Sequence, residues 1–252
     1  MAVARLPVWG LVLLCAACAR RPEPRTVSVA AAADLSFAMD EIARQYHRLH
    51  PGVELRTAYG SSGNFYAQIR NGAPFDVFLS ADMEYPRKLA QEGIGAPDSV
   101  FVYGAGRLVV WVTAKSGRNP ETALRDSSIR SVAIANPQHA PYGRAAEAAL
   151  RSLGLYRELG GKLVFGENVA QALSFVRSGA ADAGIVALSL ALAPAARRQG
   201  RYWEIPQAAY PPIRQAGIVL KPSAGARDLR SFLLSAGGRA ILERYGFTRG
   251  EP

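Results

Sequence analysis

Short apolar segments alternate with segments of helical periodicity along almost the whole chain, and this alternation is the feature that most restricts the fold. In the first helical segment, Leu35, Met39, Ile42, Tyr46 and Leu49 recur at helical spacing. Strands are predicted at residues 27–33, 53–59, 76–80, 108–113, 131–135, 162–165, 183–187 and 217–220. Helices are predicted at residues 35–49, 64–71, 82–91, 143–153, 169–178 and 226–245. Strands that alternate with helices indicate βαβ units, and therefore an α/β fold with largely parallel sheets.

The composition is typical of a chain that folds around a packed core. The sequence has 252 residues, of which 49% are hydrophobic and 20% charged, enough for one large domain or two small ones. The net charge is +10, but Lys and Arg are scattered among Asp and Glu, and no dense basic run is interleaved with aromatic residues. We therefore expect no nucleic-acid partner, while a positive surface would favour encounters with small anions.

The first 25 residues are predicted to be a leader and tether rather than part of the fold. Arg5 precedes an apolar run, Leu6 to Ala17, which is too short to span a bilayer as a helix. Cys15-Ala16-Ala17-Cys18 resembles a bacterial lipobox, so we expect lipidation of Cys18, with ordinary signal cleavage nearby as the alternative. Since no cysteine follows Cys18, the mature domain can form no disulfide, thiolate metal site or cysteine nucleophile.

Four junctions share one design, in which a strand ends in small or polar residues and a helix begins. They are Ala33-Asp34, Ser61-Ser62-Gly63, Ala140-Pro141-Tyr142-Gly143 and Glu167-Asn168-Val169. Each offers free backbone N–H groups at a helix start, where anions bind without Lys or Arg. The alternative is ordinary helix capping by Asp34, Ser62 and Asn168. Ligands of open α/β sheets bind beyond the carboxyl ends of the strands, so the four junctions could converge on one crevice.

No arrangement of residues predicts catalysis. The sequence has no His-Glu-x-x-His, no nucleophile elbow and no phosphate-binding loop ending in Gly-Lys-Ser/Thr. His47 and His50 lie on a charged helix face, and His139 is expected to stabilise its loop. Capping and surface roles are expected for Asp76, Asp82 and Glu84. We therefore expect a binding protein and not an enzyme.

The junctions and their neighbours resemble the molybdate-binding proteins of ABC transporters, which have the two-lobed type II periplasmic binding protein fold. The resemblance covers nearly the whole mature chain. Its motifs are Ala31-Ala32-Ala33-Asp34-Leu35, Ser61-Ser62-Gly63 with Gln68-Ile69, residues 72–82, Ala135-Asn136-Pro137 with Pro141-Tyr142-Gly143, Glu167-Asn168-Val169, Gly184-Ile185-Val186 and Arg244-Tyr245-Gly246-Phe247.

By its motif positions, the resemblance implies ligand contacts from Asp34, Ser62, Tyr142 and Val169, with Ala187 at a fifth site. The ligand would be molybdate or tungstate, held through its oxygens by hydroxyl and N–H groups, with no cofactor. Two of these positions depart from the commonest pattern of the family, which has serine where this chain has Asp34 and tyrosine where it has Ala187. We expect the Asp34 side chain to turn away and cap its helix, and Tyr142 to supply both its N–H and its phenol to the ligand. Sulfate, phosphate or a phosphonate is the alternative ligand, because a carboxylate such as Asp34 could accept a proton from phosphate.

The resemblance also implies one lobe at residues 26–103 plus 209–252 and another at 104–208, with hinge segments near Tyr103-Gly104 and Tyr210-Pro211. The lobes would be mixed sheets flanked by helices, closing on the anion and presenting a surface to a membrane permease. We expect a monomer in the periplasm or on the outer face of the cytoplasmic membrane. The fold also occurs in porphobilinogen-polymerising enzymes, which tether a cofactor through a cysteine that is missing after Cys18, and in DNA-tethered effector domains, whose helix-turn-helix segment is not found before Thr26.

Overall fold

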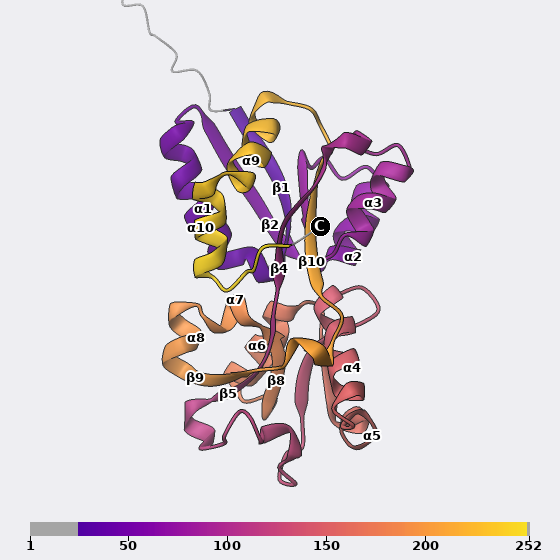
Figure 1. The fold of residues 1–252 in the computed structure, drawn as a ribbon, viewed down its shortest axis with the longest axis vertical. Coiled ribbons are helices and arrows are strands. Elements are labelled where there is room, and N and C mark those ends of the chain that lie inside the picture. Colours follow the sequence, from indigo (N-terminus) through magenta and orange to yellow (C-terminus); the bar gives the residue numbers. More distant parts are fainter. Residues whose placement is uncertain (1–24, 251–252) are drawn as a thin grey trace, which may run out of the picture.

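The computed structural model describes residues 25–250. The predicted leader and the lipidation of Cys18 lie outside these residues. The described chain forms two units, one above the other in Figure 1, each built on its own five-stranded sheet with helices on both faces. No helix within residues 25–250 is long and apolar enough to span a bilayer.

The first sheet has the strand order β2-β1-β3-β10-β4 and the second has the order β7-β6-β8-β5-β9. The strands of the first are β1 (Arg25–Ala32), β2 (Val53–Gly60), β3 (Val77–Ser80), β4 (Val100–Gly106) and β10 (Ile213–Val219). Those of the second are β5 (Leu108–Thr113), β6 (Val132–Ala135), β7 (Leu163–Gly166), β8 (Ala183–Ala187) and β9 (Gly200–Glu204). β1, β2 and β3 are parallel, as are β6, β7 and β8, whereas β10 and β5 run antiparallel to their neighbours. The predicted two-lobed α/β class with mixed sheets is confirmed.

Helices cover both faces of each sheet, which explains why the central strands are buried and mostly apolar. The helices are α1 (Ser36–Leu49), α2 (Ser62–Arg70), α3 (Glu84–Gln91), α4 (Pro141–Ser152), α5 (Tyr156–Leu159), α6 (Val169–Ser178), α7 (Leu188–Ala191), α8 (Pro194–Gln199), α9 (Ala224–Leu234) and α10 (Ala236–Arg244). α1, α9 and α10 pack on one face of the first sheet, and α2 and α3 on the other. Every residue of β3, β6 and β8 is buried, as expected of strands covered on both sides.

The chain crosses between the two sheets twice. The first crossing was predicted near Tyr103-Gly104, but β4 continues to Gly106 because residues 104–106 pair with β10, so the chain leaves the first sheet at Arg107. The second crossing lies between β9 and β10 and contains Tyr210-Pro211. The two long strands β4 and β10 lie side by side in Figure 1, β4 running toward the second unit and β10 returning from it.

Several local predictions differ from the structure: α2 and α4 each begin two residues earlier than predicted, and β10 begins at Ile213 and not at residue 217. The single helix predicted at residues 226–245 is two helices, α9 and α10, because Ser235 adopts an extended backbone (φ −72°, ψ 164°) and its side chain accepts a hydrogen bond from the Gly238 N–H at 3.2 Å. A serine that caps the next helix in this way interrupts the periodic apolar pattern only slightly. The strands β4 and β9 were not predicted.

Candidate functional site

The four junctions meet at a small cavity between the two units. The carboxyl ends of β1, β2 and β3 reach it from the first unit, and that of β7 reaches it from the second. The residues that line it are Ala32, Ala33, Asp34, Gly60, Ser61, Ser62, Ala81, Ala140, Pro141, Tyr142, Asn168 and Val169. Four of the five predicted ligand contacts, Asp34, Ser62, Tyr142 and Val169, are in this lining. The fifth, Ala187, lies fully buried at the end of β8 and is not among the lining residues. No Lys or Arg lines the cavity.

Three helix starts present unused backbone N–H groups to this cavity. Ser62 and Val169 are the first residues of α2 and α6, and Tyr142 follows Pro141 at the start of α4. Such N–H groups have no acceptor within their own helix. No other described residue accepts a hydrogen bond from them either. They are therefore available to a ligand, and the partial positive charge of each helix start favours an anion.

Other N–H groups at these helix starts are already hydrogen-bonded to capping side chains, so they are not available to a ligand. Asn168 Oδ1 accepts from the N–H groups of Ala170 and Gln171 at 3.0 and 3.1 Å, so the predicted cap at Asn168 is confirmed. The cap of α2 is Ser61, whose Oγ accepts from the Asn64 N–H at 3.4 Å, so the alternative capping role considered for Ser62 is not found. The sequence could not separate the two adjacent serines, because either can occupy a cap position.

The Ser62 hydroxyl is oriented by a backbone group of the neighbouring strand end. Its Oγ accepts a hydrogen bond from the Ala81 N–H at 2.9 Å, directly after β3, and Ser62 is buried. A hydroxyl that accepts one hydrogen bond keeps its own hydrogen for donation. Ser62 can therefore give two donors to one ligand, its N–H and its O–H.

Asp34 does not cap a helix, so its predicted capping role is wrong. No side-chain cap is present at the start of the short helical turn that contains Asp34 or at the start of α1. Asp34 is 1% exposed, and its Oδ2 accepts hydrogen bonds from Gln215 Nε2 at 2.6 Å and from the Tyr142 hydroxyl at 2.9 Å. Its Oδ1 is buried with no partner among the described residues. Burial raises the pKa of Asp34 to about 6, and the hydrogen bonds from Gln215 and Tyr142 offset part of that rise.

Gln215 is a site residue that sequence reasoning missed. It is fully buried in β10, at a β-bulge in the pairing with β4, where an irregular register re-aims the side chain. Its Nε2 reaches Asp34 and its Oε1 accepts from the Tyr103 hydroxyl at 2.8 Å. The available signal was a neutral polar residue inside an otherwise apolar strand, which must find partners when buried.

The Tyr142 phenol is directed to Asp34. It belongs to α4 of the second unit and donates to a carboxylate of the first, so this hydrogen bond connects the two units. The close approach requires a glycine at position 106, because a Cβ there would collide with the Tyr142 hydroxyl. The prediction that Tyr142 offers a backbone N–H fits the geometry, whereas its hydroxyl is used by the protein.

Further contacts join the two units around the rim of the cavity. The Gly63 N–H donates to the His139 carbonyl at 2.8 Å, and His139 Nδ1 lies 3.0 Å from Ser61 Oγ. His139 thus joins its own loop to the opposite unit. Ser189 Oγ of α7 also donates to the Asp34 carbonyl of the first unit at 2.8 Å. These contacts hold the two units together beside the cavity.

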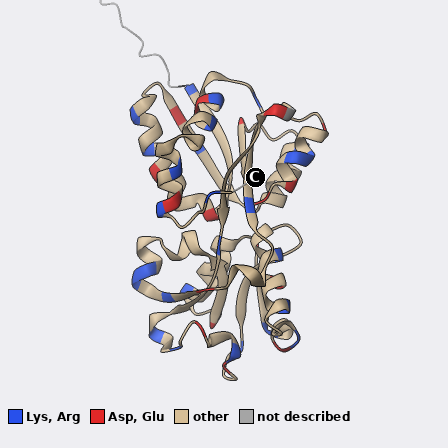
Figure 2. Ribbon diagram, viewed as in Figure 1, with Lys and Arg blue, Asp and Glu red and all other residues tan. Residues whose placement is uncertain are grey.

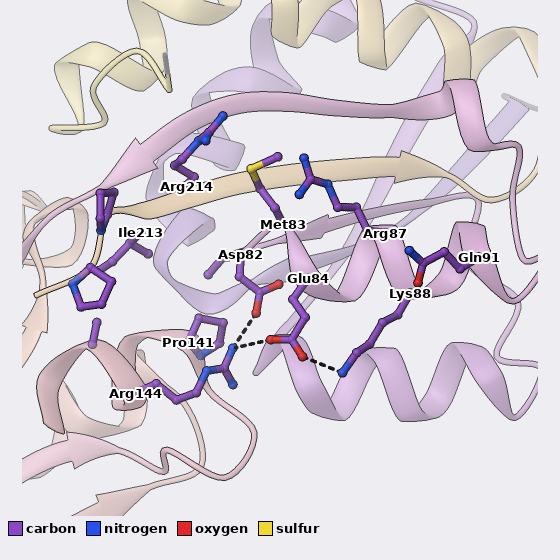
Figure 3. A pocket seen from close by; sticks show the side chains of 14 residues that line it. Asp82, Met83, Glu84, Arg87, Lys88, Gln91, Pro141, Arg144, Ile213 and Arg214 are labelled. Carbon is purple, nitrogen blue, oxygen red and sulfur yellow. Dashed lines mark hydrogen bonds and ion pairs between the residues drawn. The ribbon is translucent and has the colours of Figure 1, made fainter. Parts of the chain in front are cut away.

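An ion-pair cluster lies in a wider groove beside the cavity, shown in Figure 3. Arg144 of α4 contacts Asp82 at 2.6 Å and Glu84 at 3.9 Å across the two units, and Glu84 also pairs with Lys88. Asp82 also accepts from the Tyr85 N–H, as its predicted capping role requires. The groove has a volume of about 710 Å³ and is open to solvent.

The chain belongs to a family of bacterial extracellular solute-binding proteins, whose model matches residues 27–248. Among its relatives, the molybdate-binding protein ModA of Azotobacter vinelandii is 39% identical over 241 residues, covering 94% of this chain and 93% of that protein. ModA of Rhodobacter capsulatus is 39% identical over 199 residues, covering 78% of each chain. The solved periplasmic molybdate-binding protein of A. vinelandii superposes with a TM-score of 0.83 at 35% identity, covering 89% of this chain and all of that one. The sulfate-binding protein SubI of Mycobacterium tuberculosis, at 16% identity and a TM-score of 0.74, shares the fold.

Proposed function

We propose that this protein is the extracytoplasmic solute-binding protein of an ABC importer, and that it captures molybdate in the cavity between its two units. The observation that carries the proposal is the convergence of the free N–H groups of Ser62, Tyr142 and Val169 with the Ser62 hydroxyl in a cavity without Lys or Arg. Such neutral donors hold a tetrahedral oxyanion by charge-assisted hydrogen bonds. The names of the A. vinelandii and R. capsulatus relatives support molybdate as the ligand.

The same donors suit tungstate, which we propose as a second ligand, because tungstate is also a tetrahedral dianion and neutral N–H donors recognise that shape and charge. No cofactor is needed, and the anion would be held through its oxygens alone. No set of His, Cys, Asp and Glu within the described chain is arranged to hold a metal ion. Sulfate, phosphate and phosphonate remain the competing ligands, and the site is proposed to carry out no catalysis.

Delivery to a membrane permease is proposed to depend on closure of the two units, which act as lobes. One lobe would comprise about residues 26–103 plus 209–252, and the other about residues 104–208. The hydrogen bonds from Tyr142 to Asp34 and from Gly63 to His139 exist only when the units meet, so a ligand that binds both units favours the closed arrangement. Figure 2 shows basic and acidic residues interspersed on the outer helices of both units. We further propose that the protein is exported as a monomer to the periplasm or to the outer face of the cytoplasmic membrane, with Cys18 as a lipid anchor.

Titration calorimetry of ligand-free protein with molybdate, tungstate, sulfate and phosphate tests the ligand. One molybdate is expected to bind per chain. Because the ligand binds only native protein, a hundredfold excess over its dissociation constant should add about 2.7 kcal/mol to the free energy of unfolding and raise the melting temperature. Binding of phosphate or sulfate without binding of molybdate or tungstate would reassign the ligand.

The Tyr142→Phe variant tests the contribution of the bond between the units. We expect molybdate affinity to fall about 10-fold, because the lost hydrogen bond to Asp34 contributes about 1 to 1.5 kcal/mol to the closed arrangement. The matched control is Tyr156→Phe, which removes a hydroxyl bonded to Glu147 within the second unit and should leave affinity unchanged. Equal affinities of the two variants would show that the phenol only packs at the rim.

A further inference from the structure

Asp34 lines the proposed anion site and has one carboxylate oxygen without a hydrogen-bond partner. The residue lines the cavity and is 1% exposed, and both of its hydrogen-bond donors, Gln215 and Tyr142, act on Oδ2. Oδ1 is buried without a partner among the described residues. An ionised oxygen left in this state is costly, because a buried acceptor needs a donor. A bound proton removes the cost and turns Oδ1 from an acceptor into a donor.

The expected ligand makes the ionised form of Asp34 still less favourable. A carboxylate beside a dianion is repelled by both of its charges, and no Lys or Arg lines the cavity to compensate. The Arg144 guanidinium in the adjacent groove is already paired with Asp82. A neutral carboxylic acid has no such repulsion and can donate to an oxygen of the anion.

We propose that Asp34 is protonated in the complex and donates a hydrogen bond from Oδ1 to the bound dianion, so that the protein takes up one proton with each molybdate. The inference rests on the proposed function and deepens it. Molybdate is a dianion near neutral pH, so the proton comes from solvent and no other group gives it up. An oxyanion that carries its own proton, such as hydrogen phosphate, could instead donate that proton to the ionised carboxylate.

The titratable groups around Asp34 leave it as the group that takes the proton. Its neighbours include three phenols: Tyr142 of α4, Tyr103 of β4, and Tyr210, which lies beyond Tyr142. Burial raises the pKa of each of these phenols, so they stay protonated. The fully buried Gln215 of β10 and Ser189 of α7 are neutral. His139 contacts Ser61 at the rim, and Asp82, beyond Tyr103, is paired with Arg144.

The pH dependence of binding follows from linkage. Burial already raises the pKa of Asp34 to about 6 in the ligand-free protein, and the dianion raises it further in the complex. Below about pH 6 both states hold the proton, so affinity is flat. Above about pH 6 only the complex holds it, so affinity falls by about tenfold for each unit of pH.

Calorimetry of the full chain with sodium molybdate tests the proposal, from about pH 6 to about pH 9 and in buffers of different ionisation enthalpy. Wild-type protein should take up close to one proton per molybdate at about pH 8. In Asp34→Asn the amide is neutral at every pH and can donate in place of the acid. This variant should take up no proton, show a flat affinity, and bind molybdate at least about tenfold more tightly than wild type at about pH 8.

Asp182→Asn is the matched control, because Asp182 directly precedes the first residue of β8 and does not line the cavity. This variant should keep the wild-type dependence of affinity on pH. Binding by wild-type protein with no proton uptake and a flat affinity overturns the proposal and leaves the proposed function intact. Loss of binding in a folded Asp34→Asn variant at every pH also overturns it. Absence of molybdate binding by wild-type protein at every pH overturns the proposed function instead.

Discussion

Replacement of Ser62 by alanine is expected to weaken molybdate binding by roughly 10- to 150-fold. A hydrogen bond to a charged group contributes about 1.5 to 3 kcal/mol, which corresponds to that range of affinities. The Ser62 hydroxyl is well placed to make such a bond, because its oxygen is held by the Ala81 N–H at 2.9 Å and its hydrogen remains free. Calorimetry at one pH, with circular dichroism as the check of folding, gives the measurement.

The adjacent Ser61 provides the control. Its Oγ caps α2 through a long hydrogen bond to the Asn64 N–H at 3.4 Å and contacts His139 at 3.0 Å. Ser61→Ala should therefore lower the free energy of unfolding by about 0.5 to 1 kcal/mol, as the loss of a cap does, and change affinity only a few-fold. If Ser61→Ala lost as much affinity as Ser62→Ala, the donor would be assigned to the wrong serine.

The four junctions could be predicted from the sequence because each is a local pattern. A strand of small residues followed by a capping residue and a periodic helix sets both the helix start and its free N–H groups. Parallel topology then brings these starts to one edge of each sheet. The particular residues Ser62, Tyr142 and Val169 were implied by the resemblance to molybdate-binding proteins, because the local pattern alone placed the starts of α2 and α4 two residues later than they lie.

The surroundings of Asp34 could not be predicted in the same way. Its partners Tyr142 and Gln215 are 108 and 181 residues away along the chain, and one of them belongs to the other unit. The capping role expected for Asp34 is a local preference of aspartate at helix starts, and the buried donors of β10 and α4 override it. Gln215 is oriented by a β-bulge, which leaves no periodic mark in the sequence.

The contact between Gly63 and His139 gives a prediction about closure that is separate from the ligand donors. Gly63 is the second residue of α2, and a Cβ at this position would lie 2.6 Å from the His139 carbonyl oxygen in the opposite unit. Within its own unit the nearest atom is the Tyr85 hydroxyl at 2.7 Å, the mobile end of a side chain. Gly63→Ala should therefore oppose the meeting of the two units more than it disturbs the first unit alone.

We expect Gly63→Ala to weaken molybdate binding by roughly 5- to 150-fold, since overpacking of a close contact costs about 1 to 3 kcal/mol. The free energy of unfolding of the ligand-free protein should not fall, because alanine is the better helix former by about 0.5 to 1 kcal/mol. Gly237 is the matched control: it is also the second residue of its helix, α10, and a Cβ there meets only Ser235 Oγ at an ordinary 3.7 Å. Gly237→Ala should bind molybdate as wild type does. Small-angle scattering with and without molybdate measures closure directly, and a Gly63→Ala protein that contracts and binds like wild type would show that molybdate can be held without the Gly63–His139 contact.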